Sequence, residues 1–271
     1  MFNSKTIQRL SFICISIFGI AACNNPEEGK SKAPIPAAEQ QLRDAIAQYP
    51  DSILLTENLI QYFRENNNYG MAISEAEKAI AKDTTYDRFW DIKSTLLYES
   101  NDTLGAIKAM EKAIDLNPQP EYIITIGSMY AQTRNPLALA MADGLLQAPK
   151  ANAQKEALFI KGLYYNYSGE KQKAIGYFDA CIKIDYTNVF AYREKSICLY
   201  DLNQFQAAVE VLQKAIALQS SFAEGYYWLG KCYEKLNQRN DAIAHYQQAL
   251  QLDAEYVEAK DALAKMGAAT P

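Results

Sequence analysis

Residues 223–256 read AEGYYWLGKCYEKLNQRNDAIAHYQQALQLDAEY, and this stretch carries the pattern that organises the chain. Self-comparison shows that segments of the same pattern recur with a period of 34 residues and together cover residues 53–256. A fixed period of roughly 20–50 residues indicates a repeat architecture in which each unit is one supersecondary element. The sequence therefore predicts six units, with the bounds 53–86, 87–120, 121–154, 155–188, 189–222 and 223–256.

Small and large side chains recur at equivalent places in these units. Each unit is expected to hold two antiparallel helices, which need small residues where their axes come close. One small position is filled by Gly162, Ser196 and Gly230, and another by Ala72, Ala106, Ala174, Ala208 and Ala242. Large residues repeat on the same faces, at Leu59, Phe63, Phe178, Leu212 and Tyr246. Because a single unit leaves an apolar face uncovered, neighbouring units must stack.

The last unit resembles the tetratricopeptide repeat (TPR), whose pattern is W-x₂-L-G-x₂-Y…A-x₃-F. The matching residues, with tyrosine in place of tryptophan and phenylalanine, are Tyr226, Leu229, Gly230, Tyr233, Ala242, Tyr246 and Ala249. The second unit keeps Trp90 at its head and Pro118 near its end. The resemblance covers all six units and implies an all-α fold. This fold is a TPR solenoid, a right-handed superhelix of helix-turn-helix repeats whose first helices line a concave groove.

Both ends of the repeat array are expected to be capped. Residues 37–52 match the second helix of a repeat whose first helix is missing, through Ala38, Leu42, Ala45 and Pro50. Residues 257–271 are predicted to form a polar-faced closing helix and a tail, since terminal repeats need a solvated outer face. With two helices in each of six units, the predicted total is about 14 helices.

The third unit departs from the common frame. Gly127 lies one residue earlier than the spacing of the other units requires, Pro136 opens the second helix, and Pro149 ends it early before the polar stretch 150–154. Sequence drift with a tolerated loop and a change in the path of the superhelix both account for this, and drift is favoured because long loops cost little free energy. A hinge or a side pocket is expected here.

The first 22 residues differ from the rest of the chain. Lys5 and Arg9 are their only charged residues, and an apolar run follows from Leu10 to Ile20. A basic segment before such a run is typical of a signal peptide, and the run is too short to span a bilayer as a mature helix. We therefore predict a signal peptide over residues 1–22.

The run ends in Ile20-Ala21-Ala22-Cys23, which resembles the lipobox of bacterial lipoproteins. The resemblance implies cleavage before Cys23 and acylation of that cysteine, with palmitate among the chains; an ordinary secretory signal with an incidental cysteine is the alternative. Each buried methylene contributes about 0.8 kcal/mol, so two or three acyl chains hold a protein on a membrane. Residues 23–36 are polar and contain three prolines, which predicts a lipidated tether.

Residues just after the cysteine indicate a destination in the cell envelope. Asn24 stands where enterobacterial inner-membrane lipoproteins have aspartate, which favours the outer membrane. Glu27 and Glu28 form an acidic pair like that of surface-exported lipoproteins in one phylum. The periplasmic and surface faces of the outer membrane therefore both stay open.

The charge balance and the histidine content exclude several classes of function. Loss of residues 1–22 removes two of the 27 basic residues and none of the 32 acidic ones, which leaves a net charge of −7 and nothing to attract nucleic acid. His245 is the only histidine, so most nucleophilic triads and zinc sites are ruled out. The sequence therefore predicts no catalytic residues, no metal site and no cofactor.

Three cysteines lie within the repeats, at Cys181, Cys198 and Cys232. They occupy small-residue positions, so each is expected to replace an alanine in a helix contact. Secretion also permits a disulfide between Cys181 and Cys198, which would need a Cα separation under about 7 Å.

The concave groove is the expected binding site. The family geometry implies that its early half presents Glu57, Asp91 and Glu156. Its later half presents aromatic and basic side chains, namely Phe159, Tyr167, Phe190, Arg193, Tyr200, Tyr227 and Lys231. Aromatic and arginine residues are the usual anchors of protein interfaces, although packing alone is an equally good explanation for some of these tyrosines.

One activity known in the family is not expected. The clamp that holds the carboxylate tail of chaperones uses lysine, asparagine and arginine at successive inward positions. The matching positions here hold Glu57, Gln61, Ile92 and Glu121. Capture of a C-terminal carboxylate is therefore not predicted.

The sequence thus predicts a protein that binds and does not catalyse. The leading function is a membrane-anchored scaffold or adaptor of the bacterial cell envelope, which holds an extended segment of an unidentified protein or peptide in its groove. Lipoproteins of similar build include type IV pilus pilotins and adaptors of peptidoglycan hydrolases. The alternatives are a self-associating structural module and, less favoured, a glycan-binding protein.

Overall fold

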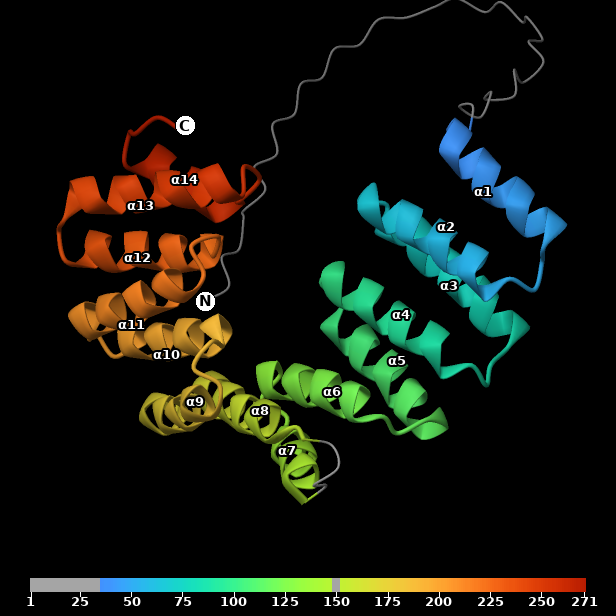
Figure 1. Cartoon of the computed structure of the whole chain (residues 1–271), viewed down its shortest axis with the longest axis horizontal. Coiled ribbons are helices and arrows are strands. Elements are labelled where there is room, and N and C mark those ends of the chain that lie inside the picture. Colours follow the sequence, from blue (N-terminus) through green and yellow to red (C-terminus); the bar gives the residue numbers. More distant parts are fainter. Residues whose placement is uncertain (1–34, 148–151) are drawn as a thin grey trace, which may run out of the picture.

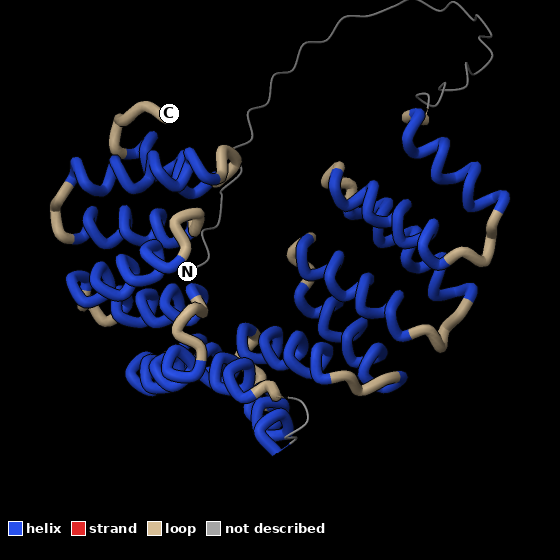
Figure 2. The backbone as a smooth tube through the Cα atoms, viewed as in Figure 1, coloured by secondary structure: helices blue, strands red, loops and turns tan. Residues whose placement is uncertain are grey.

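The computed structural model describes residues 35–147 and 152–271, in which every regular element is an α-helix (Figure 2). The 14 helices found in these residues confirm the predicted number. Their bounds are α1 (Ala37–Gln48), α2 (Ile53–Glu65), α3 (Tyr69–Lys82), α4 (Asp87–Glu99), α5 (Thr103–Leu116), α6 (Pro120–Gln132), α7 (Leu137–Gln147), α8 (Gln154–Tyr167), α9 (Lys171–Ile184), α10 (Val189–Asp201), α11 (Phe205–Leu218), α12 (Ala223–Lys235), α13 (Arg239–Leu252) and α14 (Val257–Lys265).

The helices form a curved array that is open between the end at α1 and the end at α14 (Figure 1). The predicted signal peptide and Cys23 lie outside the described residues, as does the tether up to residue 34. In the described part of the chain, no helix combines the length and the apolar character needed to cross a bilayer.

The turn inside each unit has the same backbone geometry. Asn67, Asn101, Asn203 and Asn237 are 34 residues or a multiple of 34 apart, and all have a positive φ between 55° and 68°. Asparagine tolerates this left-handed conformation better than most residues. In each case the next residue donates its amide to a carbonyl five residues back, as Asn68 does to Phe63 at 2.8 Å, which is the bond of a Schellman helix end. The turn therefore ends these first helices in the same way.

Close packing joins the two helices of a unit. The repeated alanines Ala72, Ala106, Ala174, Ala208 and Ala242 are all 0% exposed. A Cβ atom placed on Gly230 would lie 2.6 Å from the ring of Tyr246, and one placed on Gly162 would lie 2.5 Å from the ring of Phe178. The glycine thus makes room for the large side chain of the partner helix, as the sequence pattern predicts.

The third unit is shifted against the others. Helix α6 begins at Pro120, and its turn has the positive φ at Arg134, one residue earlier than the 34-residue period places it. The buried side chains of α7 (Ala138, Ala142 and Leu145) come two residues early. As a result α6 packs against α8 as well as α7, more closely than any other two successive first helices, and α7 lies on the outer side of the curve (Figure 1). The polar stretch after Pro149 lies partly outside the described residues.

Helix α1 corresponds to the second helix of a unit. Within the described residues it has no first helix of its own unit to pack against, whereas every other second helix does. None of the residues of α1 is buried, and Ala38 is exposed although its equivalents in the other units are fully buried. At the other end, α14 buries Ala259 and Leu263 against α13.

The cysteines of the repeats pack in the core. Cys181, Cys198 and Cys232 are free thiols and each is 0% exposed, so the bridge considered between Cys181 and Cys198 is absent from the structure. Burial raises the pKa of the Cys181 thiol to about 11 and that of Cys198 to about 12. A buried thiol with a raised pKa is chemically inert, which agrees with a packing role.

A substitution at Gly230 tests the packing of the unit. Leucine at this position must displace the buried ring of Tyr246, so Gly230→Leu should lower the free energy of unfolding by about 1–3 kcal/mol. The matched control is Gly176→Leu, because Gly176 is exposed on α9 and no atom of its surroundings lies within 4 Å of the place that a Cβ would take. That change should be neutral or stabilising, since glycine is a poor helix former. Denaturant unfolding of both variants gives the answer, and equal losses would contradict the register.

Candidate partner-binding groove

Three cavities follow one another along the inner side of the array, and residues of first helices form most of their walls. One of about 330 Å³ lies between α2 and α4, and one of about 360 Å³ lies between α4 and α6. The third, of about 340 Å³, lies where α6, α8 and the start of α10 meet. These cavities, together with the equivalent first-helix positions of α10 and α12, define the candidate groove. The third is lined by Ile124, Ser128, Glu156, Phe159, Ile160, Asn188, Phe190 and Arg193.

The early part of the groove combines carboxylates with arginines. Arg88 lies 3.1 Å from Glu57 and 3.7 Å from Asp91, so these two predicted acidic residues share one cation. Burial raises the pKa of the Asp91 carboxyl, and Arg88 opposes the shift. Arg64 forms a second link, donating from Nε to Glu99 at 2.7 Å. The prediction of a purely acidic early half is therefore incomplete, because it left out the arginines that the same helix face carries.

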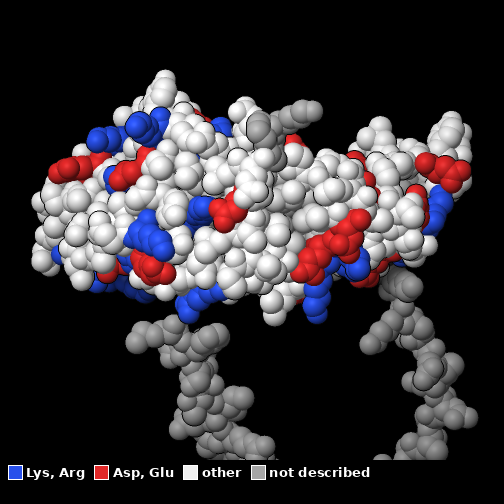
Figure 3. Space-filling model, turned by 90° about the horizontal axis from the view of Figure 1, so that it is seen from below, with Lys and Arg blue, Asp and Glu red and all other residues white. Residues whose placement is uncertain are grey.

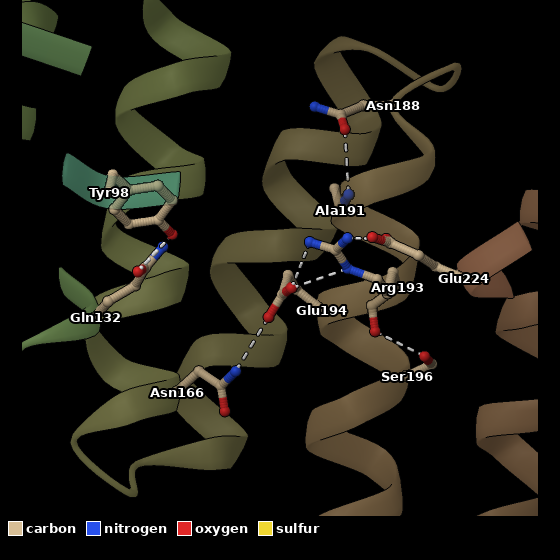
Figure 4. A network of polar contacts seen from close by, with 9 residues as sticks. All are labelled: Tyr98, Gln132, Asn166, Asn188, Ala191, Arg193, Glu194, Ser196 and Glu224. Carbon is tan, nitrogen blue, oxygen red and sulfur yellow. Dashed lines mark hydrogen bonds and ion pairs between the residues drawn. The ribbon is translucent and has the colours of Figure 1, made fainter. Parts of the chain in front are cut away.

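The middle of the groove is built around Arg193 (Figure 4). Its guanidinium donates to Glu194 at 2.9 Å and to Glu224 on the next first helix. Glu194 is buried and also accepts a hydrogen bond from Asn166 of α8 at 3.3 Å. Burial lowers the pKa of Arg193, but the two carboxylates outweigh it and raise the pKa. This network fixes α8, α10 and α12 relative to one another.

The late part of the groove holds a lysine among aromatic rings. The ammonium of Lys231 lies 4.0 Å from the ring centre of Trp228, 5.1 Å from that of Tyr200 and 5.7 Å from that of Tyr227. Such contacts stabilise a cation on the negative face of a ring. Burial lowers the pKa of Lys231 and raises that of Tyr200 to about 12. Trp228 was not among the predicted residues, because its place in the repeat suggests packing.

The seven residues predicted for the groove fall into two groups and one separate position. Phe159, Phe190 and Arg193 line the same cavity. Tyr200, Tyr227 and Lys231 form the aromatic cluster described above. Tyr167 is 41% exposed at the end of α8, where burial and the nearby Glu194 raise its pKa. His245 stacks on Tyr233 of α12, with ring centres 5.2 Å apart, and belongs to neither group.

Charges are mixed on the outside of the molecule. In the view of Figure 3, acidic and basic side chains alternate and are separated by wide uncharged areas. Both side chains are exposed in the pairs Lys82–Asp51 and Lys112–Asp115, and such pairs contribute little to stability. The network around Arg193 differs from these pairs because the side chain of Glu194 is buried.

Stacked helical units with a continuous inner groove define the class of helical solenoids. Comparison with family models agrees: a model of the tetratricopeptide repeat matches residues 87–120 and 155–188, and another matches 223–256. A third model, described as a TPR repeat, matches 199–237. The matched segments are similar to tetratricopeptide repeats, and the chain has the TPR solenoid fold.

Relatives of known function are distant. The chain is 23% identical to Stress-induced-phosphoprotein 1 of Caenorhabditis elegans over 224 residues. The aligned region covers 80% of this chain and 68% of that protein. It is 22% identical to the DnaJ homolog subfamily C member 7 homolog of Schizosaccharomyces pombe, covering 94% of this chain but 57% of the relative. For the mouse DnaJ homolog subfamily C member 7 the covered share of the relative is 24%.

Solved structures show the same fold. A tetratricopeptide repeat protein from Parabacteroides merdae superposes with a TM-score of 0.73 at 18% identity, over 85% of this chain and 91% of that one. PilW, described as a type IV pilus biogenesis factor, superposes with a TM-score of 0.59 at 17% identity, over 78% of this chain and 97% of that one. At these identities the likeness concerns the fold alone.

Removal of the central guanidinium tests the network. Arg193→Met leaves the buried carboxylate of Glu194 without its cation and should lower the free energy of unfolding by about 1–3 kcal/mol. Arg88→Met is the control, because the side chain of Arg88 is 52% exposed and its loss should change stability by less than about 0.5 kcal/mol. Chemical denaturation of the two variants compares them, and similar losses would rule out a special role for Arg193.

Proposed function

We propose that this protein is a membrane-anchored scaffold or adaptor of the bacterial cell envelope that binds an extended segment of a partner protein in its groove. TPR proteins generally mediate protein–protein interactions. The observation that supports a binding groove most directly is the aromatic cluster around Lys231, next to an apolar cavity on the same row of first helices. Rings with polar edges are common anchors of peptide interfaces.

The anchor is the second part of the proposal. The lipobox-like sequence that ends at Cys23, followed by a polar, proline-containing segment, supports a lipid attached to Cys23 and a tether of about a dozen residues. Asn24 supports the outer membrane as the destination. A scaffold held in this way would meet its partner at the membrane surface, where tethering raises the effective concentration.

The anchor is tested by Cys23→Ser. This variant cannot be acylated at residue 23, so the protein should move from the membrane fraction to the soluble fraction of the envelope, and incorporation of labelled palmitate should be lost. Fractionation of cells that express wild type and variant measures both. A variant that stays membrane-bound and labelled would contradict acylation at Cys23.

Binding in the groove is tested by the double variant Tyr200→Ala/Tyr227→Ala. Affinity capture from solubilised envelopes should recover the partner with wild type and lose most of it with this variant, since truncated aromatic anchors cost binding free energy. The matched control is Tyr49→Ala/Tyr186→Ala, because both of these tyrosines are strongly exposed and lie outside the groove. Equal recovery with the groove variant and the control would count against the groove as the binding site.

A further inference from the structure

Polar contacts join most successive first helices across the groove, but one junction lacks them. The contacts are Arg64 to Glu99 and Arg88 to Glu57 between α2 and α4, Tyr98 to Gln132 and Tyr122 to Asp87 between α4 and α6, Asn166 to Glu194 between α8 and α10, and Arg193 to Glu224 between α10 and α12. Helices α6 and α8 are both fully described, and no side-chain hydrogen bond or ion pair joins them; Gly127 of α6 packs on Ile160 of α8 instead.

At the junction between α6 and α8, Glu156 of α8 has no charged or hydrogen-bonding partner on α6. Glu156 is the second residue of its unit, and Arg88 and Glu224 are the second residues of theirs. Arg88 pairs with Glu57 and Glu224 pairs with Arg193, in each case the fifth residue of the preceding unit. Because α6 is shifted by one residue, the equivalent place before Glu156 is occupied by Ile124, which has no charge. At this junction Glu156 therefore lies opposite an aliphatic side chain, whereas Arg88 and Glu224 each lie opposite a residue of the other charge.

The carboxylate of Glu156 is incompletely satisfied. Its Oε2 is shielded from solvent and accepts no hydrogen bond from the described residues. Its Oε1 lies 3.9 Å from the ammonium of Lys155, which donates to Asp185 at 2.9 Å instead. A shielded carboxylate oxygen without a donor costs free energy, and a charged donor relieves that cost more than a neutral one.

The cavity beside Glu156 has the size and walls to take one side chain. Its volume of about 340 Å³ is at the low end of small-molecule pockets, which run from roughly 300 to 1,000 Å³. Ile124, Ile160 and the rings of Phe159 and Phe190 form the apolar part of the lining. A long aliphatic stem fits such walls, and the rings attract a cation.

The charges around the cavity favour a cationic occupant. The carboxylates of Glu156, Glu194 and Glu224 lie in or next to its lining, and the guanidinium of Arg193 is already shared between the last two. Within the cavity lining itself, the guanidinium of Arg193 lies 5.2 Å from the ring centre of Phe190, so this ring already contacts a cation. Building on the proposed function, we propose that the cavity receives a lysine or arginine side chain of the bound segment, with Glu156 as its ion-pair partner.

The proposal is tested by selecting a random peptide library, displayed on phage, against the immobilised full-length protein. Peptides selected on wild type should be enriched in lysine or arginine at one position. On Glu156→Gln that enrichment should fall by at least about tenfold while other features of the selected peptides persist. Glu121→Gln is the matched control, because Glu121 is an exposed carboxylate on the neighbouring helix α6, and it should leave the enrichment unchanged.

A second variant tests the same site from within the chain. Ile124→Lys supplies the missing cation to the cavity, so it should abolish the selection of basic peptides while the variant still unfolds cooperatively. Basic enrichment that survives in Glu156→Gln or in Ile124→Lys, or selected peptides without any basic preference, would overturn the assignment of the cavity and leave the groove intact. If wild type selects no more peptides than Tyr200→Ala/Tyr227→Ala does, both the cavity assignment and the proposed groove fail.

Discussion

The close approach of two helices inside each unit is the constraint on which the structure depends. A glycine or alanine of one helix must face a large side chain of the other, as Gly230 faces Tyr246, and any extra volume there pushes the helices apart. The left-handed turn residue fixes where the first helix ends, so the units other than the third end their first helices at equivalent positions. Identical shapes stack in the same way, and the inner faces of the first helices then align into one groove.

The third unit shows what a small departure from this constraint produces. A shift of one residue in α6 and two in α7 preserves the local packing but moves α7 outward and brings α6 against α8. The contact between those helices is apolar, and the polar pairing that continues elsewhere along the groove is interrupted there. The cavity beside Glu156 lies at this shifted junction, between α6, α8 and the start of α10.

Polar pairs along the groove connect stability with the expected function. Arg193 links α10 to α12 through Glu224, and the buried Glu194 links α10 to α8 through Asn166, so polar contacts join three first helices at the centre of the groove. Tyr200 lies on α10, and Tyr227 and Lys231 lie on α12; these side chains are held by contacts with one another. Side chains that are already ordered lose little entropy when a partner binds, which is the advantage of a preorganised site.

Helix number and the buried alanines followed from the sequence alone, because they depend on a local pattern that the 34-residue period repeats. The seven groove residues stay a prediction from the sequence, and that prediction did not include the cations that partner the acidic residues, Arg64 and Arg88, or the ring of Trp228. Which charges meet is decided by the tilt of one unit on the next, and a one-residue shift in α6 was enough to leave Glu156 facing an isoleucine position. Such pairings join residues about one repeat apart, so only the tertiary structure decides them.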